Sequence, residues 1–251
     1  MPRNQSPAPK EPTALRGAIA FEEGDFFALS PAMSGNPDAN ARRLGTRRKL
    51  LALGKEVAKE AGLECRSSLH NPHAFNGMRV SRLWTYLVRS KADKRKLKGV
   101  LGAELGKDLD AAYRNAYLCM AIEADALEVS LRIHSDAWYD GQNLKNKVGS
   151  EVRAWLGELN RLEGFRLRMD DWKGEWVCGD LTPERLEEFL SYYTPGEHRL
   201  TVDQRWPAPP GARDHAFGEE PPQRMKAELE RLFELYRFIA WSPENNFLFG
   251  G

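Results

Sequence analysis

Arg132, His134 and Asp136 have side chains suited to chemistry, and they occupy every second position of the stretch LRIHSDAW. Because successive side chains of a strand point to opposite faces, these three share one face if the strand extends through Asp136. An imidazole and a carboxylate can activate water beside a divalent ion, and a guanidinium can pair with a phosphate. His134 and Asp136 are therefore candidate catalytic residues of a metal-dependent phosphodiesterase or nuclease.

Further carboxylates could extend such a nuclease site. Glu123 and Glu128 precede the stretch, and DDWK contributes Asp170, Asp171 and Lys173. Two or three carboxylates and a lysine are the groups that metal-dependent nucleases use. The DDWK residues also fall at an expected hairpin turn, where Asp and Lys are common without any catalytic role.

Motifs for other chemistries are missing from the sequence. Cys65, His70 and His73 lie close together, but no fourth ligand follows at a zinc spacing, and Pro72 favours a rigid turn in which a histidine caps backbone groups. No nucleophile elbow and no phosphate-binding glycine loop occurs. We expect neither a metal site nor a cofactor from these residues, and the sequence does not decide whether the protein is an enzyme.

Strand alternation predicts a face rich in arginine and aromatic residues. Leu127, Val129, Leu131 and Ile133 alternate with polar residues, which is typical of a strand with one buried face. The same rule, applied to the other strands as well, predicts which side chains point away from the core. These are Arg82, Trp84, Tyr86, Arg132, His134, Arg166, Arg168, Trp172 and Arg205. Aromatic rings stack on nucleic-acid bases and guanidinium groups pair with phosphates, so this face is a candidate nucleic-acid or polyanion surface.

The opposite interpretation uses the same strands. Glu128, Asp136, Asp170 and Asp203 would also lie on or near this face, where cross-strand ion pairs would neutralise much of its positive charge. Arginine and tryptophan are ordinary residues of a half-solvated strand surface. Both interpretations remain open at this point.

Two basic clusters lie outside the strands. The first, RRLGTRRK, contributes Arg42, Arg43, Arg47 and Arg48 to a predicted helix, and the second, RSKADKRKLK, spans residues 89–98. Cations on one helix can contact a phosphate backbone without reading its sequence, although such a run is more often a solvated helix face. These residues join the candidate binding set.

Hydrophobic periodicity predicts an α+β fold with a mainly antiparallel sheet of about seven strands. Successive strand-strand-helix units recur, the helices lie chiefly on one face, and further helices stand at both ends of the chain. Asp140 is predicted to cap a helix that begins after it, and Thr182 another that begins at Pro183. The predicted parts are an irregular, partly disordered arm (1–37), an α+β core domain (38–206), a Pro-rich connector (207–222) and a C-terminal helix and tail packing on the core (223–251).

Composition limits the function classes. The 37 Lys and Arg nearly balance the 36 Asp and Glu, so any polyanion site has to be local. The three cysteines form no pair motif, and no apolar run is long enough for a membrane span, which predicts a cytoplasmic protein without membrane association. The leading hypothesis is a nucleic-acid or polyanion binding module; the alternatives are a phosphodiesterase and a protein-interaction subunit, and the oligomeric state is not predicted.

Overall fold

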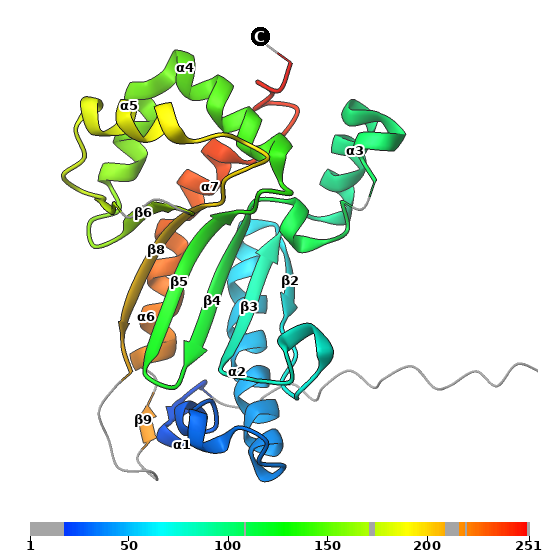
Figure 1. The fold of residues 1–251 in the computed structure, drawn as a ribbon, viewed down its shortest axis with the longest axis vertical. Helices are drawn as coiled ribbons and strands as arrows, with labels where there is room; N and C mark the ends of the chain where they lie inside the picture. The colour runs from blue at the N-terminus through cyan, green and yellow to red at the C-terminus, as the bar shows by residue number, and fades with distance from the viewer. Residues whose placement is uncertain (1–17, 108, 171–173, 209–215, 219, 250–251) are drawn as a thin grey trace, which may run out of the picture.

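A single antiparallel sheet of seven strands forms the centre of the computed structural model, which describes residues 18–107, 109–170, 174–208, 216–218 and 220–249. The strand order is β2-β3-β4-β5-β8-β6-β7 (Figure 1). In chain order the strands are β2 (Glu64–Ser67), β3 (Arg82–Val88), β4 (Tyr117–Glu123), β5 (Ala126–Ile133), β6 (Arg166–Met169), β7 (Trp176–Val177) and β8 (Leu200–Pro207). The predicted α+β class and antiparallel sheet are confirmed.

Two helices, α2 (Asp38–Ala61) and α6 (Glu220–Arg231), pack on one face of this sheet (Figure 1). Gly54 allows α2 to approach closely, because a Cβ atom there would lie 2.4 Å from the Thr85 Cγ2 and 2.8 Å from the Cys65 Sγ. Thr85 and Met120 therefore point toward α2. By alternation, their neighbours along β3 and β4 point to the opposite face.

The remaining long helices lie near one end of the sheet. They are α3 (Lys91–Leu105), α4 (Trp138–Asn160), α5 (Pro183–Tyr192) and α7 (Phe233–Ile239). Figure 1 shows α4, α5 and α7 grouped beyond the ends of the central strands, with α3 to one side. Among the described residues, no helix combines the length and the apolar character needed to cross a membrane.

The alternation predicted for β5 is present. Leu127, Val129, Leu131 and Ile133 are buried in the main hydrophobic core. Each such side chain contributes roughly 1.5–3 kcal/mol by leaving water. This burial fixes the register of β5, because a shift by one residue would turn these four side chains out of the core.

The two predicted helix caps have different outcomes. Thr182 caps α5 as expected, with its hydroxyl accepting from the Arg185 N–H at 3.4 Å. The prediction for Asp140 is wrong, because α4 begins at Trp138 and Asp140 lies inside its first turn. Asp140 instead pairs with a distant arginine and with two backbone groups outside the helix, contacts that the local sequence does not indicate.

The polar residues of α4 that follow Asp140 hold the C-terminal segment. The Asn143 side chain accepts from the Phe247 N–H at 2.8 Å and donates to the Ile239 carbonyl at 3.2 Å. The Lys147 ammonium donates to the Asn245 side chain at 2.7 Å and lies 4.0 Å from the centre of the Phe238 ring. The stretch that follows Arg132, His134 and Asp136 therefore serves largely to hold residues 238–248.

Two short strands that are far apart in the sequence also pair. Residues 1–17 of the predicted arm lie outside the described residues, but Phe21 and Phe26 are buried in the core. Within the described ranges, three 3-10 turns lie at Pro31–Met33, Ala74–Asn76 and Ala112–Arg114. The short elements of the arm are β1 (Phe21–Glu22) and α1 (Glu23–Phe27), and β1 pairs with β9 (Ala216–Gly218). The range 207–222, predicted as a Pro-rich connector, contains β9 and the start of α6 at Glu220.

Candidate nucleic-acid interface

The sheet face opposite α2 and α6 collects most of the predicted binding residues. Residues directly paired in neighbouring strands share a face, so the register extends the assignment from β3 and β4 across the sheet. Three rows cross this open face. They are Trp84, Ala121, Glu128 and Arg205; Tyr86, Cys119, Ser130, Asp203 and Arg166; and Tyr117, Arg132, Thr201 and Arg168.

Small side chains form the floor of the open face. Cys119, Ala121 and Ser130 lie at its centre and are almost completely buried, although neither α2 nor α6 packs on this side. The long arginine and aromatic side chains of the neighbouring positions cover them. A small-residue floor leaves room for these long side chains to lie along the sheet, where they form hollows.

A chain of ion pairs fixes the arginines at the centre of the face. Arg82 donates to Glu123 at 3.1 Å and to Glu128 at 2.8 Å, and Arg132 donates to the same oxygen of Glu128 at 2.5 Å. Arg205 lies 2.7 Å from the other oxygen of Glu123. Burial alone would raise the pKa of Glu128, but the charges of Arg82 and Arg132 outweigh it and lower that pKa to about 2. Glu128 is therefore ionised at neutral pH and holds both guanidinium groups.

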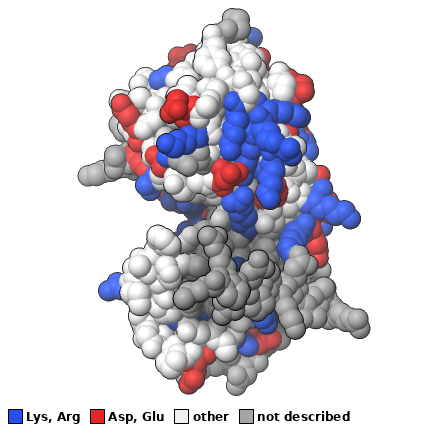
Figure 2. All heavy atoms as spheres, turned by 90° about the vertical axis from the view of Figure 1, so that its right-hand side faces the viewer, with Lys and Arg blue, Asp and Glu red and all other residues white. Residues whose placement is uncertain are grey.

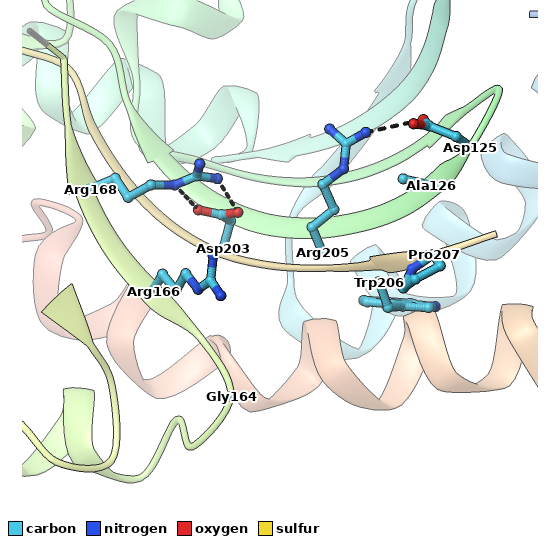
Figure 3. A pocket seen from close by; sticks show the side chains of 9 residues that line it. All are labelled: Asp125, Ala126, Gly164, Arg166, Arg168, Asp203, Arg205, Trp206 and Pro207. Atoms are coloured by element: carbon cyan, nitrogen blue, oxygen red, sulfur yellow. Dashed lines mark hydrogen bonds and ion pairs between the residues drawn. The ribbon is translucent and has the colours of Figure 1, made fainter. Parts of the chain in front are cut away.

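The part of the face formed by β8 and β6 is also neutralised. Arg168 makes a two-pronged contact with the buried carboxylate of Asp203, and Arg205 reaches Asp125 (Figure 3). Burial, partly offset by Arg168, raises the pKa of Asp203. Arg166 lies 3.0 Å from Glu175. The interpretation in which cross-strand pairs cancel charge therefore describes this half of the face.

A different environment lies at the β2 and β3 side. Here a cavity of about 890 Å³ is lined by aromatic rings, arginines and small polar residues, and no Asp or Glu is among its described lining residues. We call this cavity the aromatic cleft and define it by Phe75, Trp84, Tyr86, Tyr113, Tyr117, Arg79 and Arg82.

Separate segments of the chain supply these rings. Trp84 and Tyr86 come from β3 and Tyr117 from the start of β4, whereas Tyr113 belongs to the 3-10 turn before β4. The Tyr86 and Tyr117 rings meet edge to face, with centroids 6.2 Å apart. Tyr113 is 45% exposed and Phe75 is 91% exposed, so both present ring surface to solvent. Exposed π-faces beside an arginine without an ion pair in the described ranges, Arg79, suit an anionic ligand that carries flat rings.

Cations surround the aromatic cleft. Arg79 is exposed and makes no ion pair within the described part of the chain. Arg66 lies beside Tyr86 in the β2–β3 register; its guanidinium donates to the Asp110 carbonyl at 2.8 Å and lies 3.7 Å from the Glu64 carboxylate. Arg47 reaches over from α2 and donates to the Ser68 carbonyl at 2.8 Å. These groups give the cleft a positive margin.

A smaller hollow extends the cleft toward the centre of the sheet. Its volume is about 230 Å³, and it shares Arg82, Trp84 and Tyr117 with the cleft while adding Cys119 and Arg132. Arg132 in turn lines a third hollow of about 390 Å³ with Arg168 and Thr201. The hollows thus adjoin one another across the open face, and arginines stand where they meet.

The first basic cluster divides into structural and exposed residues. Arg43 is buried and donates to the Ala28 carbonyl at 2.9 Å and to the Met33 carbonyl at 2.8 Å. Arg42 pairs with Glu22 at 2.6 Å. These two arginines hold residues 21–33 against α2, and we remove them from the candidate binding set because their guanidinium groups are already engaged.

Arg47 and Arg48 take the other role within the same helix. Arg48 is exposed, and both arginines lie close enough to His70 to add to the effect of burial in lowering its pKa. Since Ser68 lines the cleft and accepts from Arg47, this part of the cluster lies at the cleft margin. The sequence could not separate the two halves of RRLGTRRK.

The second basic cluster divides in the same way. Arg89 is buried and pairs with Asp140 at 2.5 Å, and Lys94 is buried as well. Lys91, Arg95 and Lys96 are exposed on α3. Figure 2 shows Lys and Arg side chains gathered over the upper half of the molecule, at the height where Figure 1 places α3.

His134 and Asp136 lie beyond the end of β5, which stops at Ile133. The His134 Nδ1 accepts from the Asp136 N–H at 3.1 Å, and the two side chains lie 3.6 Å apart. Burial, supported by the charge of Arg199, lowers the pKa of His134. The strand therefore does not extend through Asp136, which was the condition for the three side chains to share one face, and His134 shapes the turn that follows β5.

The described residues contain no group of three or more His, Cys, Asp or Glu side chains arranged to hold a metal ion. Asp171, Trp172 and Lys173 of the DDWK motif lie outside the described residues.

His73 caps the 3-10 turn at Ala74–Asn76 by accepting from the Phe75 N–H at 3.3 Å, as the turn interpretation predicted. Burial raises the pKa of Cys65 to about 12, so its thiol is protonated at neutral pH.

Comparison with known proteins adds no further identification. No family model matches the chain, and no curated protein matches its sequence. The aromatic cleft therefore has to be interpreted from its own chemistry.

Proposed function

We propose that this protein binds single-stranded nucleic acid, with bases stacked on the rings of the aromatic cleft and phosphates paired with the arginines at its margin. The observation that carries the proposal is the lining of the cleft, where five aromatic residues lie beside Arg79, an arginine with no ion pair among the described residues, and where no Asp or Glu is among the described lining residues. A base offers two π-faces to such rings, and a phosphate offers oxygens to a guanidinium.

Single-stranded ligands fit this surface better than a duplex groove does. In a duplex the faces of the bases are stacked on one another, so they are not available to Trp84 or Tyr113. Sheet platforms that stack bases usually take two or three of them. The adjoining hollows would let a strand continue from the cleft toward Arg132 and Arg168.

The ion-paired arginines at the centre of the open face have a supporting role in this proposal. Glu128 holds Arg82 and Arg132 by short contacts, so these guanidinium groups lose little conformational freedom when a phosphate approaches. Because their charge is shared with Glu128, they contribute less attraction than Arg79, which makes no ion pair among the described residues. We therefore place the main phosphate contact at Arg79.

Fluorescence anisotropy with labelled single-stranded DNA and RNA of about 10 nucleotides tests the proposal. Replacing Trp84 with Ala should weaken binding roughly 5- to 150-fold, the loss expected for one base stacked on an aromatic ring. Phe249→Ala is the matched control, because Phe249 is also exposed but belongs to the C-terminal segment outside the cleft lining. Binding of the wild type should also weaken as salt increases.

Two results would overturn the proposal. The first is the absence of salt-dependent binding to either nucleic acid by the wild-type protein. The second is an equal loss of affinity in Trp84→Ala and Phe249→Ala, which would separate binding from the cleft. Circular dichroism of each variant shows whether the fold is retained.

A further inference from the structure

The loop between β2 and β3 exposes apolar side chains at the margin of the cleft. We call residues 69–79 the rim loop. Leu69 is 42%, Phe75 91% and Met78 62% exposed, and Phe75 has the largest exposed fraction among the large hydrophobic residues that the structure describes. Leu69 and Phe75 line the aromatic cleft, so this apolar surface continues directly from it.

Hydrogen bonds within the rim loop hold this exposed arrangement. The Asn76 side chain accepts from the His73 N–H at 2.8 Å and donates to the Asn71 carbonyl at 2.8 Å. The Met78 N–H donates to the His73 carbonyl at 2.9 Å. An exposed apolar group on a flexible loop could fold back onto the protein, whereas these bonds favour keeping Phe75 and Met78 in solvent.

The backbone of Met78 carries a further cost. Its φ of 61° lies in the left-handed region, and no other non-glycine residue in the described ranges has a positive φ. Side chains rarely adopt this conformation because Cβ approaches the backbone. A strained residue at an exposed position, close to a candidate site, indicates a functional use of its side chain.

Phe75 already belongs to a short stack. Its ring lies on the His73 ring with centroids 4.9 Å apart and planes at 28°. His73 covers one side of the Phe75 ring, and the exposed fraction of 91% leaves the rest open. An exposed ring stacked from one side can accept another flat ring system on its other side.

We propose that the rim loop stacks on the last base pair of a duplex, so that the preferred ligand is a duplex with a single-stranded extension. The inference rests on the proposed function, because the extension would occupy the aromatic cleft. Phe and Met are among the apolar side chains that proteins place against base steps. The rim loop contains no Asp or Glu, and Arg79 at its end is exposed, so its charge suits the phosphates near a duplex end.

Three labelled probes distinguish this inference from the proposed function. They are a single strand, a blunt duplex and a duplex carrying that single strand as an extension at either end. The wild type should bind one of the extended duplexes roughly 5- to 150-fold more tightly than the single strand, which is the contribution of one additional stacking contact. The blunt duplex should bind weakly, since it has nothing to place in the cleft.

Met78→Gly is the most informative variant. Glycine adopts the backbone conformation of Met78 without strain, so the loop should keep its structure while losing the side chain. Its preference for the extended duplex should fall toward equal binding of the extended duplex and the single strand, while its affinity for the single strand stays at the wild-type value, because Met78 does not line the cleft. Phe75→Tyr keeps the ring and should retain the preference, and Leu105→Ala, at an exposed position on α3, should leave it unchanged.

The three probes distinguish a failure of the rim-loop inference from a failure of the proposed function. If the wild type binds the single strand and the extended duplex equally, or if Met78→Gly keeps the full preference, the rim-loop inference is wrong and the proposed function stands. If none of the three probes binds, the proposed function fails together with the inference.

Discussion

Asp140 and the aromatic cleft show two ways in which this molecule uses charged and aromatic residues. At Asp140 one carboxylate oxygen accepts from Arg89 at 2.5 Å and from the Trp241 N–H at 2.9 Å, and the other accepts from the Ala116 N–H at 2.7 Å. In the cleft, Arg79 makes no ion pair among the described residues and Phe75 is 91% exposed. The same residue types stabilise the fold where the protein completes their contacts, and they remain available to a ligand where it does not.

The strongest test of this comparison is Asp140→Asn. The substitution leaves the buried guanidinium of Arg89 without its counter-ion, and breaking a buried pair in this way costs about 3–5 kcal/mol of the free energy of unfolding. Urea denaturation measures the change. Asp136→Asn is the control, because its side chain is 51% exposed and should change stability by less than about 0.5 kcal/mol. Similar losses in both variants would contradict a special role for Asp140.

Acid denaturation examines the centre of the open face. Because the pKa of Glu128 is lowered to about 2 from 4.5, its ionisation stabilises the fold fully above pH 4.5, and this stabilisation is lost as the pH falls through 2. The difference corresponds to about 3 kcal/mol. Glu128→Gln should therefore be less stable than the wild type at pH 7 by that amount and equally stable near pH 2. A gap that does not depend on pH would show that the charge of Glu128 is not its source.

Arg43 and Arg48 of α2 test the comparison through a change of intermediate size in the free energy of unfolding. Arg43→Ala removes the donors to the Ala28 and Met33 carbonyls and should lower the free energy of unfolding by about 2 kcal/mol. Arg48→Ala, at an exposed position five residues later, should change it by less than about 0.5 kcal/mol. Thermal unfolding of both variants measures the difference, and equal melting temperatures would refute the division of the cluster.

The smallest effect on stability is expected at Arg79. Arg79→Ala should leave the unfolding transition unchanged and weaken binding of single strands of any sequence. The slope of the logarithm of the binding constant against the logarithm of salt concentration should decrease by about 0.7, the value for one phosphate contact on a single strand. Arg153→Ala, an exposed residue of α4, is the control and should keep the wild-type slope.

The sequence predicted the strands and the face that their outward residues share. The alternation along β5 and the residues Arg82, Trp84, Arg132 and Arg168 could be assigned to one surface because strand geometry is local. The partners of these residues could not be predicted in the same way. Whether Arg82 meets Glu128, or Arg42 meets Glu22, depends on strand order and on how the arm packs, and both involve distant parts of the chain.

The aromatic cleft was only half predicted for the same reason. Trp84 and Tyr86 follow from the alternation of β3, but Tyr113, Tyr117 and Phe75 reach the cleft through the β3–β4 pairing and two irregular segments. The nearest sequence signal is the short run AYRNAY, which places two tyrosines around an arginine just before a strand. Irregular segments have no periodicity, so their side-chain directions cannot be derived from spacing.

The contacts of α4 with residues 241 and 247 have a consequence for protein synthesis. Asp140 and Asn143 bind backbone groups that follow them by 101 and 104 residues. When α4 leaves the ribosome, those partners do not yet exist, and at roughly 5–20 residues per second they follow only several seconds later. During that interval Arg89 and Asp140 can meet, but the surface that later receives residues 238–248 is exposed to chaperones and proteases. That surface is covered only when residues 238–248 have been synthesised.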